Sequence, residues 1–162
     1  IYYSLLVKLA ATFNCSMDEA KKFHIWHEVK VAQPLDIVGA QWKFFHSVHA
    51  IPALGCRVSK DIGGKKGLLH ISGDHLSDAA LATMLEKGGI SKARYEQVMN
   101  LLTGEETLVL VDAGGGLIHG DFHDYLSRNQ RIGFMHTGLI QEDLPKGMSL
   151  VKSGEVINVL AK

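Results

Sequence analysis

The sequence predicts an α/β fold, and two observations lead to that prediction. Segments with the apolar alternation of strands take turns along the chain with segments that have helical periodicity and capping residues. The run 107–111 is apolar almost throughout, which is typical of a strand buried on both faces of a sheet. The 162 residues are enough for a single domain, 1–162, with a substantial core.

The first part of the chain predicts two short helices and then a strand. Apolar residues within 2–13 fall on one helical face. A second helix is expected to begin at a capping box that starts with Ser16 and to run towards Ile25. Alternating apolar residues then indicate strand structure within 29–37.

The middle of the chain predicts strands followed by two helices. Three runs have the apolar pattern of strands: 42–48, 54–58 and 68–71. The glycine- and lysine-rich segment 61–67 is expected to form a hairpin-type turn. A helix is expected over 79–87, with Ser77 or Asp78 as its cap. A second helix is expected to begin at Ser91, which can cap it, and to end at Gly104.

The last third of the chain predicts two further strands with polar ends. The strand 107–111 runs into Asp112, and a short helix is expected near 118–123. The apolar run 132–135 predicts another strand, and two short β-like runs follow Pro145.

Composition excludes several classes of function. The formal net charge is zero, which argues against nucleic-acid binding by bulk electrostatics. Cys15 and Cys56 give no disulfide framework, so we expect a reduced, cytoplasmic setting. No apolar run is long enough to cross a membrane, and we expect no membrane partner. Because the sequence starts at Ile1 within a helical pattern, we expect a fragment or a processed chain.

Polar side chains gather where the predicted strands end. Two strand-like runs end in His46-Ser47-Val48-His49 and in Ser72-Gly73-Asp74-His75, and later strands lead to Asp112, His119 and His136. A single such His is most often a hydrogen-bonded structural residue. Several strands that deliver His and Asp to one sheet edge indicate a functional site. His and Asp ligands without thiolates suit zinc, with manganese and iron as alternatives.

The glycine run 114–116 after Asp112 has two interpretations. Its backbone N–H groups, that of Gly115 among them, could cradle a phosphate. It could equally be a tight turn that requires positive φ angles. The run matches neither the dinucleotide-binding fingerprint nor the P-loop.

Two segments resemble the metallo-β-lactamase-fold hydrolases. His49-Ala50-Ile51-Pro52 is similar to the family segment in which a ligand His precedes a small residue and Ile-Pro, and Ser72-Gly73-Asp74 is similar to the family's Ser-Gly-Asp strand end. Phe134-Met135-His136 is similar to the late strand that ends in the last ligand His. The subgroup nearest in pattern is the phosphodiesterase-like branch, with tRNA-processing ribonuclease Z and relatives linked to cyclic-nucleotide domains. The resemblance covers about residues 40–140.

The resemblance implies two divalent metal ions as cofactors. Asp74 would bridge them, while His49 and His136 would each bind one. His75 stands where the family more often has Thr or another small residue, so it is a candidate for an additional ligand or for a partner of the ligands. His46 is a further candidate, either for a contact to the metal ligands or for substrate binding.

The resemblance also implies a route for a proton. Asp112 would orient His119, and His119 would protonate the leaving oxygen of the substrate. His123 is the alternative acid and ranks lower, because it falls within an expected helix.

One part of the family pattern is absent. The His-x-His-x-Asp-His run that supplies the first metal ligands does not occur in this sequence. In the family fold, an αββα sandwich, each half supplies a sheet and helices. We therefore expect this chain to be the second half, with the N-terminal half of the same protein as its partner and a homodimer as another candidate assembly.

The expected function is metal-dependent hydrolysis of a phosphodiester in a small molecule or a nucleotide. Without the missing ligands, this chain alone is expected to bind metal weakly and to be inactive. Two alternatives remain open: a non-catalytic half-domain used as a scaffold or for dimerisation, and a thioester or lactone hydrolase on the same fold.

Overall fold

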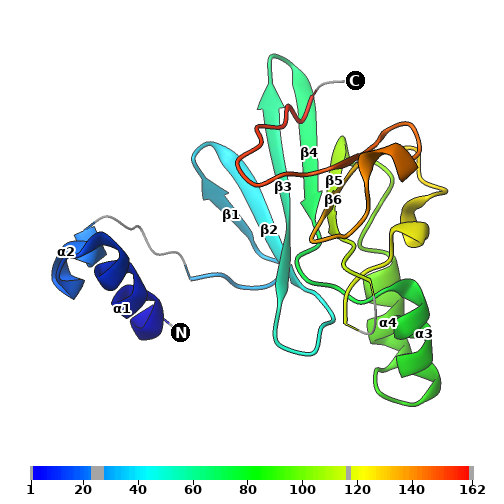
Figure 1. Ribbon diagram of the computed structural model, residues 1–162, viewed down its shortest axis with the longest axis horizontal. Coiled ribbons are helices and arrows are strands. Elements are labelled where there is room, and N and C mark those ends of the chain that lie inside the picture. The colour runs from blue at the N-terminus through cyan, green and yellow to red at the C-terminus, as the bar shows by residue number, and fades with distance from the viewer. Residues whose placement is uncertain (1, 23–27, 116–117, 161–162) are drawn as a thin grey trace.

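The computed structural model describes residues 2–22, 28–115 and 118–160, and this part of the chain contains one seven-stranded sheet (Figure 1). The strands lie across the sheet in chain order: β1 (Pro34–Ile37), β2 (Ala40–His46), β3 (Leu54–Ile62), β4 (Lys65–Ile71), β5 (Leu108–Asp112), β6 (Arg131–Met135) and β7 (Met148–Leu150). β1 to β4 pair antiparallel, whereas β4 to β7 pair parallel. The prediction of an α/β fold is confirmed.

The antiparallel half is longer than its apolar pattern indicates. β3 continues to Ile62 and β4 begins at Lys65, so the predicted turn at 61–67 shrinks to Gly63 and Gly64. Both glycines have positive φ, as two-residue hairpin turns require. The prediction failed because residues 60–66 at the tip of the hairpin are exposed and mostly charged or glycine, so they show no apolar alternation in the sequence.

The first strand is also shorter than predicted. β1 starts only at Pro34, whereas the prediction began at residue 29. β1 is an edge strand, which is where a proline without a backbone N–H group is tolerated at the start of a strand. After Pro145, one of the two expected β-like runs forms a strand, β7, and none of the described residues beyond it does.

Two helices connect β4 to β5, and both predicted caps form. α3 (Asp78–Glu86) is capped by Ser77, and α4 (Lys92–Met99) is capped by Ser91. The helices pack together through buried Leu81 and Val98. α4 ends at Met99, earlier than the predicted 104, and the N–H of Leu101 then donates to the carbonyl oxygen of Val98 in a tighter closing turn.

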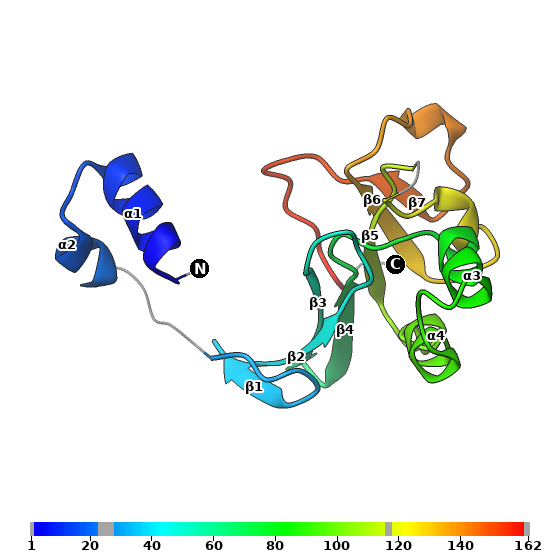
Figure 2. The ribbon, with the colours of Figure 1, turned by 90° about the horizontal axis from the view of Figure 1, so that it is seen from below.

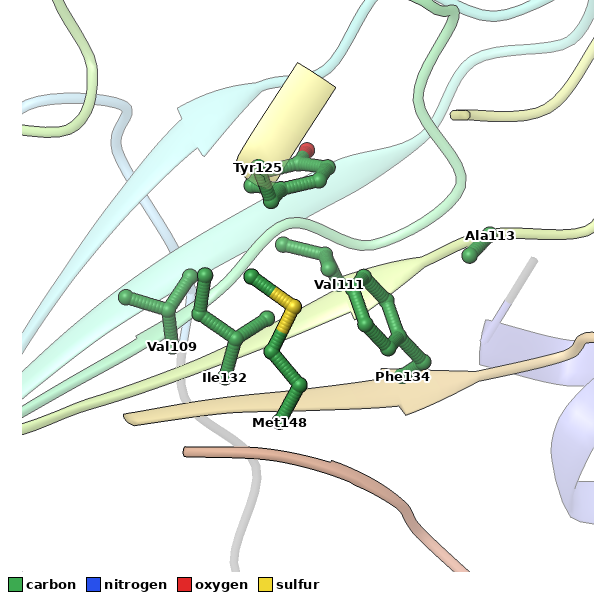
Figure 3. Close-up of a cluster of buried hydrophobic side chains, with 7 residues drawn as sticks. All are labelled: Val109, Val111, Ala113, Tyr125, Ile132, Phe134 and Met148. Carbon is green, nitrogen blue, oxygen red and sulfur yellow. The ribbon is translucent and has the colours of Figure 1, made fainter. Parts of the chain in front are cut away.

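The main core lies against the parallel half of the sheet (Figure 3). It combines alternate residues of β5 and β6 with Tyr125 of the short 3₁₀ helix η1 (Phe122–Tyr125) and with Met148 of β7. A second 3₁₀ helix, η2 (Gln141–Asp143), precedes β7. The residues of this core are Val109, Val111, Ala113, Tyr125, Ile132, Phe134 and Met148.

The N-terminal helices form a separate small cluster. α1 (Tyr2–Phe13) and α2 (Met17–Lys22) pack on each other through Leu6, Ala10 and Ala20, and Figure 2 shows them apart from the sheet. The predicted capping box at Ser16 forms. The rest of the helix predicted towards Ile25 lies outside the described residues, and the prediction of a single domain over 1–162 stays a prediction.

None of the helices within the described ranges has the length and apolar character that a membrane span requires.

A buried carboxylate fixes the connection into β5. Glu106 accepts hydrogen bonds from the N–H groups of Thr103 and Gly104 and from Gln130, and its Oε1 lies 3.3 Å from Nη2 of Arg57. Burial alone raises the pKa of Glu106, yet the hydrogen bonds from Thr103 and Gln130 outweigh it and hold the pKa at about 2. The ionised carboxylate therefore organises the loop between α4 and β5.

Replacing Glu106 with Ala is expected to lower the free energy of unfolding by about 2–3 kcal/mol. The change strands buried donors, although Arg57 keeps partial access to water, which limits the loss. Urea unfolding measures the effect, and Glu105→Ala is the matched control because Glu105 is exposed. A Glu106→Ala protein as stable as the control would contradict the anchoring role.

Candidate metal centre

The candidate residues lie at the carboxyl ends of neighbouring parallel strands, which form one edge of the sheet. Asp112 is the last residue of β5, and Asp74 and His136 follow the ends of β4 and β6. β4, β5 and β6 are parallel neighbours, so their carboxyl ends meet at the same edge. This explains how residues far apart in the sequence come close in space.

Four side chains converge at this edge. One ligand atom from each of Asp74, Asp112, His119 and His136 lies within 4.8 Å of the others. Oδ2 of Asp112 lies 2.7 Å from Nδ1 of His119, and its Oδ1 lies 3.4 Å from Nδ1 of His136. The two imidazole rings meet edge-on, with centroids 4.4 Å apart. We call these four residues the Asp/His cluster.

The Asp112 carboxylate is buried and held on several sides. Its side chain is only 3% exposed, and the backbone N–H of Gly114 donates to its Oδ1 at 3.1 Å. The backbone N–H of Asp112 itself donates to Oγ of Ser72, which ties the end of β5 to the end of β4. Asp112 is thus positioned to orient His119 through Nδ1, as a carboxylate does for a catalytic or ligating imidazole.

Glycines let the loop after β5 fold back on itself. A Cβ atom at Gly114 would lie 2.9 Å from Cγ of His119 and 2.9 Å from the carbonyl oxygen of His136. Gly115 has a φ of 70°, and its N–H donates to the carbonyl oxygen of Gly120 at 3.0 Å. The geometry at Gly115 favours the tight-turn interpretation of the glycine run, since this N–H group is already used. Gly116 lies outside the described residues.

His49 lies beside the Asp/His cluster, in the loop between β2 and β3. Its ring centroid is 5.6 Å from that of His119. Nδ1 of His49 accepts from the N–H of Ile51 at 3.4 Å, while its Nε2 is buried without a hydrogen-bond partner among the described residues. A buried imidazole nitrogen of this kind needs a partner, and a divalent cation would satisfy it. The donor set therefore fits a metal centre.

A serine that sequence reasoning did not single out joins the two loops. Oγ of Ser47 donates to the carbonyl oxygen of Ser72, and the N–H of Ser47 donates to the carbonyl oxygen of Ala53 at 3.1 Å. Gly73 has a φ of 64°, and a Cβ atom there would lie 3.3 Å from Oγ of Ser47. These contacts fix His49 and Asp74 relative to each other. The sequence carries no signal for them beyond a serine at each strand end.

His75 supports the loop that carries His49. Its Nδ1 accepts from the N–H of Val48 at 3.1 Å. Burial, and to a smaller extent the nearby Arg94, lowers the pKa of His75 to about 4. His75 is not one of the four converging residues, and the role predicted for it as an additional ligand or a partner of the ligands stays a prediction.

His46 and His123 lie outside the Asp/His cluster. His46 is the exposed last residue of β2, and its carbonyl oxygen accepts from Nη2 of Arg94 at 2.6 Å. His123 is exposed in η1, with Nδ1 2.7 Å from Oδ1 of Asp121. The roles assigned to both from the sequence stay predictions.

A buried histidine within β4 is not apparent from the sequence. His70 lies within β4, stacks on Phe45 with ring centroids 5.0 Å apart, and has a buried Nδ1 without a partner among the described residues. Burial, and to a smaller extent the Arg57 guanidinium, lowers the pKa of His70 to about 4. The sequence offers no signal for it, because a polar residue in an apolar strand normally faces solvent.

His70 is expected to make the protein less stable in acid. Because an unfolded His titrates near 6.5, the unfolded chain binds more protons than the folded one between pH 6.5 and 4. The free energy of unfolding is thus unaffected by His70 above pH 6.5. Below that pH it falls towards pH 4, by at most about 3 kcal/mol for this group. Thermal melts across that interval should show a shallower pH dependence for His70→Gln than for His46→Gln. Equal slopes in the two variants would contradict the assignment.

Comparison with known proteins identifies one curated relative. No protein-family model matches this chain. Over 116 residues the chain is 33% identical to the cGMP-dependent 3′,5′-cGMP phosphodiesterase A of Dictyostelium discoideum. The predicted resemblance to a phosphodiesterase is confirmed. The match covers 72% of this chain and 13% of that protein, so the chain corresponds to a small part of the phosphodiesterase.

Two solved structures are also similar. The metallo-β-lactamase fold protein YhfI from Bacillus subtilis matches 78% of this chain and 52% of its own length, at 12% identity and a TM-score of 0.49. A diphosphatase from the PhnP family matches 80% of this chain and 46% of its own length, at 17% identity and a TM-score of 0.49. This chain spans about half the length of each.

Proposed function

We propose that this chain supplies the second half of a metal-dependent hydrolase domain that cleaves phosphodiesters. The observation that carries the proposal is the Asp/His cluster at the ends of three parallel strands, with the unpartnered Nε2 of His49 beside it. The sequence similarity to a cGMP phosphodiesterase supports a phosphodiester as the substrate.

Asp74, His49 and His136 would hold two divalent cations, with Asp74 as the bridging ligand. Zinc suits these donors best, and manganese and iron are the alternatives. Metal ions bound there would polarise the phosphoryl oxygen and supply hydroxide at neutral pH. The remaining ligands would come from the N-terminal half of the same protein.

His119 would act as the general acid. The buried Asp112 carboxylate accepts a hydrogen bond from the protonated Nδ1 of His119, which fixes the ring and leaves Nε2 to donate a proton. A leaving alkoxide is a strong base, so its protonation as the bond to phosphorus breaks lowers the barrier. Asp112 acts here as a positioning residue, because it reaches the substrate only through His119.

The test compares the hydrolysis of three substrates by the protein at its natural full length. A nitrophenyl phosphodiester, a thioester and a lactone are each offered with added zinc and again after chelation. Hydrolysis of the phosphodiester that stops on chelation is the expected result. Preferred hydrolysis of the thioester or the lactone would replace the proposed substrate class. No hydrolysis of any of the three would favour the scaffold role.

A further inference from the structure

A hollow away from the Asp/His cluster is lined by positively charged side chains. It has a volume of about 260 Å³ and lies between β2 and α4. Its cationic residues are Lys43 of β2, Arg57 of β3 and Arg94 of α4, and no carboxylate is among the described residues that line it. We call it the basic groove. None of the four residues of the Asp/His cluster lines it.

Two of these cations lie side by side on neighbouring strands. Lys43 and Arg57 are direct partners in the antiparallel register of β2 and β3. Like charges in such a pair destabilise a sheet. Glu106, 3.3 Å from Arg57, offsets one of the two charges, but within the described residues Lys43 has no ion pair. An anion in the basic groove would remove the remaining repulsion.

Arg94 is held in place at the wall of the basic groove. Its Nη2 donates to the carbonyl oxygen of His46 at 2.6 Å, and its Nη1 donates to Oε1 of Gln97 at 2.8 Å. A guanidinium has five N–H donors, so three have no hydrogen-bond partner among the described residues and remain for a ligand. A fixed guanidinium with free donors is the group that proteins use for bidentate contacts to phosphate.

We propose that the basic groove binds the phosphate group of a small phosphomonoester. Because Glu106 offsets the charge of Arg57, the positive charges of Lys43 and Arg94 remain, and together they match a phosphate dianion. The volume of the hollow approaches the lower end of the range for small-molecule sites. Phe45, which lies on the same face of β2 as Lys43, also lines it and offers an apolar surface to the rest of the ligand. The proposal does not rest on the proposed hydrolase function, because it needs neither the metal nor the Asp/His cluster.

Calorimetric titration with 5′-GMP, inorganic phosphate and guanosine, in the presence of a chelator, tests the proposal. Binding of the first two and not of guanosine is expected. Lys43→Gln should weaken 5′-GMP binding by about tenfold or more, the usual loss for one charge-assisted hydrogen bond, and Lys43→Arg should retain most of it. Lys43 is exposed, so neither change should disturb folding.

Two control variants distinguish binding in the basic groove from bulk electrostatic attraction and from binding at the Asp/His cluster. Lys60 of β3 is exposed and points to the opposite face from Arg57, so Lys60→Gln should leave affinity unchanged. Asp74→Ala should also leave it unchanged. Equal loss in Lys43→Gln and Lys60→Gln would reveal bulk electrostatic attraction and overturn the proposal. Unchanged binding in Lys43→Gln, or loss of binding in Asp74→Ala, would overturn it too.

Discussion

Asp74→Ala is expected to abolish metal binding and hydrolytic activity together in the full-length protein. Asp74 is the exposed carboxylate of the Asp/His cluster, and it follows a strand end that Ser47 and Gly73 hold in place. A bridging ligand contacts both ions, so its loss disrupts both positions at once. We expect activity to fall by more than about 100-fold, beyond the usual effect of changing an outer residue of a metal site.

Elemental analysis and rate measurements on the same samples test this expectation. Asp61→Ala is the matched control, because Asp61 is an exposed carboxylate on β3 that takes no part in the Asp/His cluster. The control should keep the metal content and rate of the wild type. Normal metal content in Asp74→Ala would rule out the bridging role.

His119→Ala is expected to retain metal and to lower kcat by about 10²–10⁴-fold, the usual contribution of a positioned general acid. The defect should shrink for a nitrophenyl phosphodiester, because nitrophenolate leaves without protonation. An alkyl phosphodiester should show the full defect. The measurement is therefore kcat for two leaving groups, in wild type and variant, with metal content determined in parallel.

Two other roles for His119 give different results. If Nε2 of His119 binds metal while Asp112 orients the ring, the variant loses metal and both substrates suffer alike. If His119 only supports the loop after β5, stability falls and the rate per folded molecule is unchanged. His123→Ala is the control for both, since His123 is exposed and pairs with Asp121. Equal rate losses for the two substrates at full metal occupancy would exclude the acid role.

The gathering of polar residues at the carboxyl ends of the strands could be predicted from the sequence, because these strands are short apolar runs. The runs 68–71, 107–111 and 132–135 are each followed by polar residues, and the parallel order of β4, β5 and β6 then brings those polar residues together. The close approach of Asp112 to His119 was implied by the family resemblance and is present at 2.7 Å. Their catalytic roles stay proposals.

Other features left no pattern in the sequence. The outer part of the β3–β4 hairpin consists mostly of exposed charged residues and glycines, so apolar periodicity could not reveal it. Glu106 resembles any surface glutamate until the fold surrounds it with donors from Thr103 and Gln130. The basic groove likewise depends on strand register, which alone places Lys43 opposite Arg57.

The proposed function requires that the Asp/His cluster and His49 belong to a metal centre. Crystals of the full-length protein soaked in zinc, with data collected on both sides of the zinc absorption edge, test this requirement most directly. We expect an anomalous peak within about 2.0–2.2 Å of a carboxylate oxygen of Asp74 and of a ring nitrogen of His136. Zinc bound elsewhere, with none at the ends of β4 and β6, would contradict a metal centre at this edge of the sheet.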